Sequence, residues 1–313
     1  MAYVSFPGLG IEPFYMERVA FSIGKIDVNW YGVIITCGMI LAVLYALWHA
    51  KIESVKSDDV IDLALAGIIS GIIGARLYYV IMEWQDYLVT DKGFFRNVWE
   101  TFLGVINIPG GGLAIYGGII GGFFACLVVA RVKHIHFPII ADIAGPAVFV
   151  GQILGRWGNF VNVEAFGGPT ELPWRMCSEV VARDFLKKGL VDFSGYQAVL
   201  DGSLGAHPTF LYESLWNLIG LIIITVLYKK KKFHGQMFLL YITWYGFGRM
   251  LIEALRTDSL AVGDIRISQL VALATFVLGT VLLVLGSRKA AKQKKIEVNL
   301  ENTNEENTNG TLN

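Results

Sequence analysis

Charged side chains are scarce in this sequence, and together they carry no net charge. Asp, Glu, Lys and Arg form 17% of its 313 residues, and hydrophobic residues form 54%, whereas a soluble domain has roughly 25% charged residues. The 26 basic and 26 acidic residues cancel, so no positive excess favours a nucleic-acid partner. The composition, with a mean hydropathy of +0.54, therefore predicts a protein whose solvent is lipid.

Cysteine is nearly absent. The three cysteines are Cys37, Cys126 and Cys177, and none has the CxxC spacing of a zinc or redox site. We expect them to be buried thiols outside any disulfide framework. The five histidines form no HExxH motif or other metal-ligand pattern, and GxSxG is also missing. The sequence therefore predicts no metal, no organic cofactor and neither of these hydrolytic mechanisms.

The N-terminal segment lacks the features of a cleaved signal peptide. It has no basic n-region, no continuous apolar segment and no small-residue cleavage site. We therefore expect residues 1–29 to form an arm that lies along the membrane surface.

Long apolar runs dominate the rest of the chain. Seven segments approach the roughly 20 apolar residues that a helix needs to cross a bilayer. They cover residues 30–50, 60–82, 112–130, 139–157, 210–228, 237–255 and 267–285, and Asp142, Gly145 and Pro146 interrupt the fourth. The predicted fold is an all-α integral membrane protein with seven transmembrane helices, four of them in residues 30–157 and three in residues 210–287.

Lysine and arginine concentrate in KIESVK, RVKHIH, KKKKFH and SRKAAKQKK. Such clusters in short segments indicate the cytoplasmic side, which predicts an N-terminus outside and a C-terminus inside. Residues 158–209 contain enough aromatic side chains for a small ordered extracytoplasmic head. Residues 288–313 are too polar to bury much surface, so we expect a disordered cytoplasmic tail.

Glycine is abundant, with 35 residues, and much of it lies in runs such as GGGLAIYGGIIGG, residues 110–122. Small residues at this spacing let helix backbones approach closely, and helix packing accounts for most of these glycines. Glycine beside polar groups also lets a ligand approach the backbone. Tyr116, in the middle of the run, is then the side chain best placed to face a cavity.

The densest polar chemistry lies in GRWGNFVNVEAFG, residues 155–167. It places Arg156, Asn159, Asn162 and Glu164 at the outer end of the fourth span. An arginine near a helix end can simply extend to the headgroups. That alternative gives no reason for the two asparagines and the glutamate behind it, so a functional site is the better interpretation.

A second polar set lies in YGFGRMLIEALR, in the sixth span. Tyr245, Arg249 and Glu253 are four residues apart and Arg256 follows, so they share one stripe of a helix. Arg249 and Glu253 could form an i,i+4 ion pair of purely structural value. Because burying both charges in lipid is costly, a stripe that lines a wet cavity is the better interpretation.

Three smaller elements lie toward the same outer side: Tyr31 in NWYG, Arg76 in GARLYYV, and His207, Tyr212 and Glu213 in HPTFLYE. Singly, each has a structural explanation, such as a charge in the first turn of a helix for Glu213. Together, the three arginines imply a bound anion, because guanidinium groups match phosphate oxygens. In a membrane the nearest abundant anion is a phospholipid headgroup. The residue chemistry alone does not distinguish whether the lipid is cleaved, moved or merely bound.

These motifs, in this order, resemble those of the prolipoprotein diacylglyceryl transferase family, over residues 22–258. The resemblance implies a multi-pass enzyme of the bacterial cytoplasmic (inner) membrane. Such an enzyme transfers the diacylglyceryl group of phosphatidylglycerol to the thiol of a lipobox cysteine in a preprolipoprotein and releases glycerol 1-phosphate.

Site residues follow from the same resemblance. It implies that Arg156 and Arg249 hold and neutralise the phosphate, and that Tyr116 occupies a catalytic position. The other residues that it assigns to phosphatidylglycerol binding, together with Arg76, are Asn159, Glu164, Gly167, Tyr31, His207, Tyr245, Glu253 and Arg256.

Tyr116 departs from the family pattern, because many members that resemble this chain have a histidine there as proposed general base. Tyrosine, with a pKa of about 10, is rarely ionised at neutral pH. Either another group takes the thiol proton, or nearby arginines ionise the substrate cysteine enough to attack without a dedicated base. We favour the second explanation.

Two other classes of function compete with the enzyme. A binding or transport protein could use the same arginines to recognise an anionic lipid and carry it unaltered. A retinal-binding photoreceptor would need a lysine in the last span, and residues 267–285 contain none.

Overall fold

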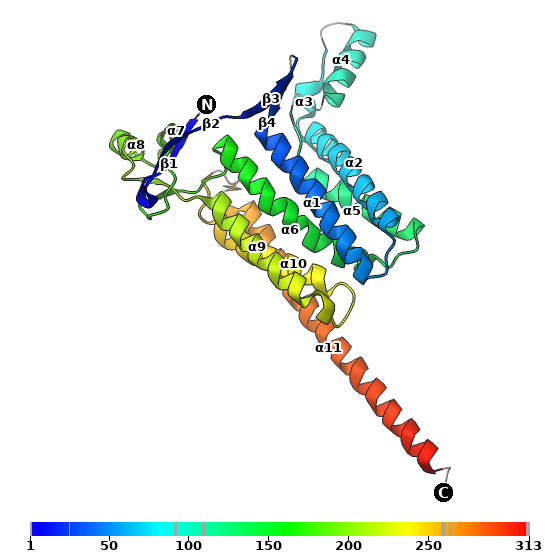
Figure 1. Ribbon diagram of the computed structural model, residues 1–313. Helices are drawn as coiled ribbons and strands as arrows, with labels where there is room; N and C mark the ends of the chain where they lie inside the picture. Colours follow the sequence, from blue (N-terminus) through cyan, green and yellow to red (C-terminus); the bar gives the residue numbers. More distant parts are fainter. Residues whose placement is uncertain are drawn as a thin grey trace. The chain divides into compact units, whose positions relative to one another are not determined.

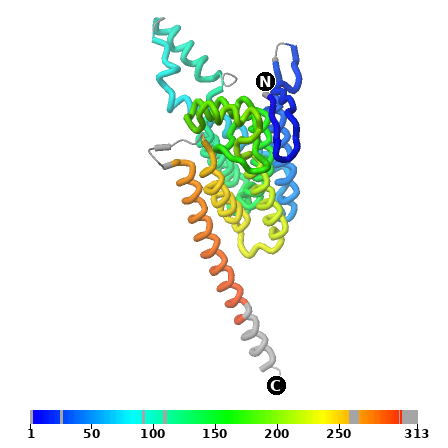
Figure 2. Tube along the Cα trace, turned by 90° about the vertical axis from the view of Figure 1, so that its left-hand side faces the viewer, coloured from blue at the N-terminus to red at the C-terminus, as the bar shows by residue number. Residues whose placement is uncertain are grey.

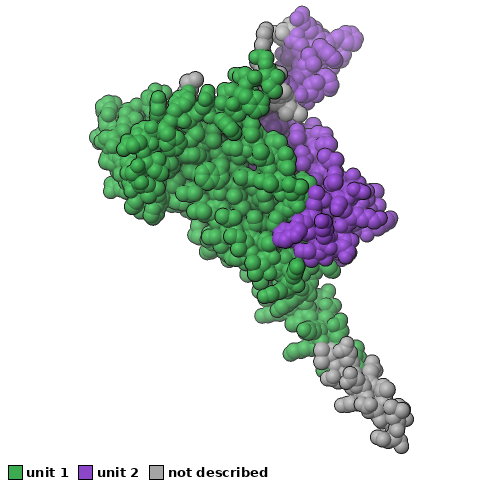
Figure 3. All heavy atoms as spheres, in the orientation of Figure 1, with its two compact units in different colours: residues 1–45, 142–313 green, residues 46–141 purple. Residues whose placement is uncertain are grey.

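The computed structural model describes residues 2–24, 26–90, 93–107, 111–257, 261–262 and 265–310 (Figure 1). The chain divides into two compact units. Unit 1 contains Met1–Tyr45 and Asp142–Asn313, and unit 2 contains Ala46–Ala141 (Figure 3).

Long helices form most of the chain. Within the described ranges, six are long and apolar enough to cross a membrane, which makes this a multi-pass membrane protein. They are α1 (Trp30–Ile52), α2 (Ser57–Met82), α5 (Ile115–Val132), α6 (Phe137–Asn162), α9 (Thr209–Leu227, continued by the short helix η3, Tyr228–Lys230) and α11 (Ile267–Gly310). The sixth predicted span is also a helix, α10 (Gln236–Glu253), but its sequence is too polar to meet the same criterion.

Two helix boundaries differ from the prediction for local reasons. Helix α5 begins at Ile115 instead of residue 112. Gly111 and Gly112 have positive φ angles of 88° and 77°, which lie outside the right-handed helical region, so the helix cannot include them. Helix α6 continues through Pro146 to Asn162, five residues beyond the predicted end at 157. This extension places the GRWGNFVN segment on the last turns of a helix.

The C-terminal segment also differs from expectation. The polar composition of residues 288–313 predicted a disordered tail, whereas α11 continues as a helix through Gly310. Each residue added to an existing helix gains one backbone hydrogen bond, and the unfavourable nucleation step does not have to be repeated. The membrane span at the start of α11 supplies that nucleus.

The N-terminal arm is built from strands, not helix. Strands β1 (Ala2–Phe6) and β2 (Ile11–Met16) form one antiparallel hairpin, with the short helix η1 (Pro7–Leu9) at its turn, and β3 (Val19–Ile23) and β4 (Ile26–Asn29) form a second. The all-α prediction therefore describes the spans and not the arm. The backbone of Ser5 in β1 exchanges two hydrogen bonds of 3.0 Å with Cys177, which ties the arm to the head segment.

The head segment, residues 158–209, contributes most of a hydrophobic core that it shares with the arm and with Phe210 of α9. It contains β5 (Pro169–Thr170), α7 (Glu179–Lys187), α8 (Phe193–Leu200) and β6 (Gly205–Ala206). Phe166, Val181 and Phe185 are buried together with Val4 of the arm. Burial raises the pKa of the Cys177 thiol to about 11, so this cysteine stays protonated and unreactive.

Helices α9, α10 and α11 follow one another as neighbours in unit 1 (Figure 2). Trp216 of α9 and Trp244 of α10 stack with ring centroids 4.5 Å apart. Each indole N–H donates to the backbone carbonyl of the other tryptophan, at 3.0 and 2.8 Å. A Cβ at Gly248 would lie 2.0 Å from Trp216, and one at Gly220 would lie 2.5 Å from Trp244. The two tryptophans therefore fix the axial position of α10 relative to α9.

Asp142, which made the fourth span look doubtful, caps α10 from α6. Its buried Oδ1 accepts from the backbone N–H of Met237 and Phe238 at 2.8 and 3.1 Å. Its Oδ2 accepts from the backbone N–H of Gly235 at 2.8 Å and from Lys231 Nζ at 2.9 Å. The first N–H groups of a helix have no partner within it, and a negative charge is favourable there. Asp142 thus sets the height of α10 against α6.

In unit 2, α2 and α5 pack through the glycine run. A Cβ at Gly74 would lie 2.4 Å from the carbonyl oxygen of Gly117, and one at Gly121 would lie 2.3 Å from that of Ser70. Helix packing is therefore confirmed as a function of these glycines. The connection from α2 to α5 contains two helices that the sequence did not reveal, α3 (Trp84–Tyr87) and α4 (Phe94–Ile106).

Candidate anion-binding site

Three helices of unit 1, α6, α9 and α10, bring charged side chains together. Arg156 comes from the last turns of α6, Glu213 from α9, and Arg249 and Glu253 from the end of α10. These helices run next to one another in Figure 1, and the ion pairs below join their side chains.

Glu213 is shared by two arginines. Arg156 Nη2 donates to its Oε1, and Arg249 Nη1 donates to its Oε2 at 2.9 Å. Arg249 Nη2 also pairs with Glu253 Oε2 at 2.6 Å. The predicted i,i+4 pair of Arg249 and Glu253 is therefore confirmed, and it is one link in a longer chain of charges.

These charges are withdrawn from solvent. The side chains of Glu213 and Glu253 are 3% and 2% exposed, whereas those of Arg156 and Arg249 keep 19% and 17% exposure. Two positive and two negative charges balance, which a buried cluster requires. The accessible part of the cluster is its guanidinium side, so an incoming group meets donors rather than acceptors.

The structural alternative for Glu213, a charge in the first turn of its helix, does not hold. Glu213 is the fifth residue of α9 and the one charged residue between Thr209 and Leu227. An isolated ionisable residue within an apolar span is a default indicator of function. That signal could have identified Glu213 before the structure was known.

The segment after α6 extends the network. Arg156 Nη1 lies 3.4 Å from Asn159 Oδ1. The amide groups of Asn159 and Asn162 both donate to Glu164 Oε1, at 2.8 and 3.3 Å. One chain of contacts that begins at Arg156 therefore includes Asn159, Glu164 and Asn162. This arrangement fixes the position of the Arg156 guanidinium.

Gly167 is a close backbone crossing. Its N–H donates to the carbonyl of His207 at 2.9 Å, and it forms a β-bridge with Arg256. A Cβ at Gly167 would lie 2.8 Å from His207 Cβ and 2.9 Å from the carbonyl oxygen of Leu255. Glycine is required here because the strand-like segment after α6 passes directly beside the end of α10.

His207 contacts this crossing directly, whereas Tyr31 and Tyr245 contact α6 and α10 elsewhere. His207 Nδ1 lies 3.3 Å from the hydroxyl of Tyr212, and burial lowers the pKa of His207 below its ordinary value, so the ring is neutral at pH 7. The Tyr31 ring lies against Gly158 of α6, where a Cβ would approach it within 2.9 Å. Tyr245 stacks on Tyr241 one turn below Arg249, with centroids 6.1 Å apart.

Arg76 belongs to unit 2, and its contacts there differ from the expectation of a phosphate ligand. The buried guanidinium donates to four backbone carbonyls: Gly104 and Val105 at 2.7 Å each, Gly111 at 2.6 Å and Gly112 at 3.0 Å. Most of its five donors are therefore occupied by backbone. Its role in the structure is to hold the end of α4 and the turn that starts α5.

Tyr116 also lies in unit 2, on the first turn of α5. It is 39% exposed, and its ring centroid lies 6.5 Å from that of Tyr78. The residue is thus partly exposed and in contact with α2 through Tyr78, and the expectation that it faces a cavity stays a prediction.

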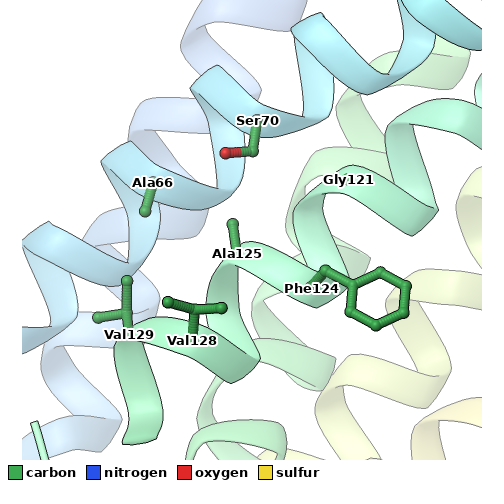
Figure 4. A pocket seen from close by; sticks show the side chains of 7 residues that line it. All are labelled: Ala66, Ser70, Gly121, Phe124, Ala125, Val128 and Val129. Atoms are coloured by element: carbon green, nitrogen blue, oxygen red, sulfur yellow. The ribbon is translucent and has the colours of Figure 1, made fainter. Parts of the chain in front are cut away.

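A shallow groove between α2 and α5 has a volume of about 410 Å³. Its lining residues, drawn in Figure 4, are Ala66, Ser70, Gly121, Phe124, Ala125, Val128 and Val129. Ser70 is the one polar side chain among them, so an anionic headgroup would find no charge to pair with in this groove. Within the described parts of the chain, no group of three His, Cys, Asp or Glu residues could hold a metal ion.

The geometry defines the class of this protein: a multi-pass membrane protein with a cluster of arginines suited to an anion. Comparison with known proteins then gives the family. The family model described as prolipoprotein diacylglyceryl transferase matches residues 18–285, and the chain belongs to that family.

Curated relatives agree. The chain is 42% identical to a phosphatidylglycerol–prolipoprotein diacylglyceryl transferase of Finegoldia magna over 86% of this chain and 95% of that protein. It is 40% identical to the protein of the same name from Clostridioides difficile over 88% of this chain and 97% of the relative.

Replacement of Gly167 by alanine should destabilise the protein. The added methyl group would displace His207 or the end of α10, and such overpacking costs about 1–3 kcal/mol. The neighbouring Gly168→Ala is the matched control, because its Cβ would meet only ordinary contacts of 3.8 Å. Thermal unfolding in detergent should show a clear loss for the first variant and little change for the second. Equal behaviour of the two would contradict the assigned crossing.

Replacement of Glu213 by alanine leaves two guanidiniums without their shared carboxylate. Breaking a buried pair in this way costs about 3–5 kcal/mol, so the thermal unfolding temperature should fall. Glu179→Ala, which removes an exposed partner of Arg183, should change stability by less than about 1 kcal/mol.

An anion should partly rescue the Glu213 variant. If the arginines accept phosphate, phosphatidylglycerol added to the detergent should restore the stability of Glu213→Ala more than phosphatidylcholine does. Equal effects of the two lipids would show that the cluster does not recognise the phosphoglycerol headgroup.

Proposed function

We propose that this protein transfers the diacylglyceryl group of phosphatidylglycerol to the thiol of the lipobox cysteine in preprolipoproteins, releasing glycerol 1-phosphate. This reaction is the first step of bacterial lipoprotein maturation. One observation carries the assignment to this site: Arg156 and Arg249, from separate helices, converge on one buried carboxylate. The relatives named for phosphatidylglycerol and prolipoprotein support the choice of substrates.

The proposed chemistry is a displacement at a glycerol carbon. The cysteine thiol loses its proton to water, and the thiolate sulfur forms a C–S bond with the glycerol carbon. The C–O bond from that carbon to the phosphate breaks, and the electron pair of this bond stays on the phosphate oxygen. The leaving phosphate therefore gains negative charge in the transition state. Positioned arginines stabilise such developing charge without having to reorient, which is the role that we assign to Arg156 and Arg249.

Glu213 prepares the two arginines for this role. It holds one guanidinium on each of its carboxylate oxygens, and together with Glu253 it balances the charge of both arginines. Each arginine uses only one donor nitrogen on Glu213, so each retains donors for a phosphate oxygen. Glu253 holds the second terminal nitrogen of Arg249. The arginines are thus positioned before the lipid arrives, and binding does not have to order them.

The remaining site residues support this core. Asn159 and Glu164 position Arg156 through the contacts described above. Gly167, His207 and Arg256 form the backbone crossing beside the end of α10. Tyr31 and Tyr245 line the neighbouring helix faces. We assign these residues to the phosphatidylglycerol site and leave Arg76 out, because its donors are occupied.

Tyr116 is proposed to take part in catalysis without acting as a base. The thiol of a free cysteine has a pKa of about 8.5, which nearby cationic groups lower. The arginines of the site can therefore ionise the substrate thiol enough for attack. Tyr116 then contributes through its ring.

The proposed topology has seven spans in the bacterial cytoplasmic membrane, with the N-terminus outside and the C-terminus inside. Helix α10 is added to the six apolar spans as the sixth in chain order, because it packs between α9 and α11 and its charges are buried against protein. The basic segments at Lys51, Arg131, Lys229 and Arg288 then all fall on the cytoplasmic side.

The deciding assay uses purified protein in bilayers of phosphatidylglycerol with a lipobox peptide, and measures glycerol phosphate release. Arg156→Ala and Arg249→Ala should each lower the rate at least roughly 100-fold, the usual cost of removing one preorganised donor. Arg183→Ala, which alters an exposed arginine, should leave the rate unchanged. A peptide with serine in place of cysteine should give no product.

Unchanged release by both arginine variants would eliminate the proposed site. Movement of labelled phosphatidylglycerol across the bilayer without any release of glycerol phosphate would support a transporter instead.

Tyr116→Phe should retain most of the activity, and Tyr116→Ala should lose more of it, because the ring rather than an ionised hydroxyl is proposed to matter. The rate of the Tyr116→Phe enzyme should rise with pH as the substrate thiol ionises. An inactive Tyr116→Phe enzyme with normal thermal stability would show that the hydroxyl acts chemically.

A further inference from the structure

Helix α4 (Phe94–Ile106) has one wholly apolar half. At 100° per residue, its large apolar side chains fall within one half of the helix circumference. They are Phe94, Phe95, Val98, Trp99, Phe102, Leu103 and Ile106, each between 43% and 87% exposed. An exposed apolar surface of this extent on a protein marks a place of interaction.

The other half of α4 is polar or is packed against the segment before it. Arg96 and Glu100 form an exposed ion pair of 2.9 Å. Thr101 Oγ1 accepts a hydrogen bond of 3.1 Å from the backbone of Val89. A Cβ at Gly104 would lie 3.3 Å from the ring of Tyr87. The apolar half therefore faces away from the α3 segment.

The position of α4 along α2 is fixed by Arg76. Its Nε and Nη2 bond to the carbonyls of Val105 and Gly104, at 2.7 Å each. Arg76 lies six residues before the end of α2 at Met82, which is about 9 Å along a helix. The C-terminal end of α4 is thus tied to a level just inside the end of a membrane span. Figure 1 shows α3 and α4 beyond that end of α2.

A helix of 13 residues is about 20 Å long, too short to cross a hydrocarbon core of about 30 Å. A short amphipathic helix at this level instead lies in the membrane plane, with its apolar face buried roughly 5–10 Å into the boundary of headgroups and acyl chains. Tryptophan is enriched at this depth. The ion pair on the opposite face carries no net charge, so the lipid contact depends on apolar burial.

We propose that α4 lies in the leaflet in which α2 ends, with the aromatic half of α4 inserted among lipid headgroups and upper acyl chains. Because Arg76 also bonds to the carbonyls of Gly111 and Gly112, the same arginine connects this bilayer anchor to the turn that begins α5. This inference goes beyond the transfer reaction and does not depend on it.

The test measures the depth of each face in nanodiscs. In the full chain with Cys37, Cys126 and Cys177 replaced by alanine, Phe95→Cys reports the apolar face and Arg96→Cys, the next residue, reports the polar face. Each is labelled with bimane. Lipids brominated on the acyl chains should remove most of the emission at position 95 and little at position 96. Iodide in the water should have the opposite effect.

Three results would overturn the proposal. Equal quenching of both positions by iodide would place α4 in water. Quenching of position 95 by neither agent would show that protein covers this face, either another part of this chain or a second copy. Quenching of position 96 rather than 95 by brominated lipid would reverse the assigned faces.

A second measurement leaves the cysteines intact. In nanodiscs with brominated lipid, Trp99→Phe should lower the quenched fraction of tryptophan emission relative to the unaltered protein. An unchanged quenched fraction would place Trp99 outside the lipid and contradict the proposal even if the cysteine-free protein failed to fold.

Discussion

The ion pairs of Glu213 are the interaction on which the site depends. A buried carboxylate in an apolar helix is costly unless it is paired, and Glu213 is paired with arginines from two other helices. The same contacts hold α6, α9 and α10 together at one end and position both guanidiniums. One cluster therefore both stabilises the packing of three helices and positions the arginines of the proposed site.

The rest of unit 1 keeps these three helices at the heights that the cluster needs. Asp142 caps α10 from α6 at the other end. Trp216 and Trp244 fix α9 against α10 through stacking and two reciprocal hydrogen bonds. A shift of α10 by one turn, about 5.4 Å, would separate Arg249 from Glu213. Asp142, Trp216 and Trp244 therefore fix the position of α10, which is the least apolar of the long helices.

Apolar length predicted the positions of the spans well, because a bilayer requires about 20 apolar residues whatever the tertiary structure. The glycine run and the two arginine motifs were also visible. The contacts of Arg76 could not be predicted, since a guanidinium near the end of a span looks the same in sequence whether it meets phosphate or backbone carbonyls. The strands of the arm, α4 and the helical tail were missed, because local composition there permits more than one backbone structure.

The sequence by itself determined that this is a multi-pass membrane protein with buried charges, since hydropathy and the cost of charge in lipid depend only on residue type and spacing. Motif order also determined the family. Only the tertiary structure decided which charges meet: it paired Glu213 with Arg156, 57 residues away, and with Arg249, 36 residues away. Helix periodicity relates residues three or four apart, and it contains no information on which faces of separate helices pack together.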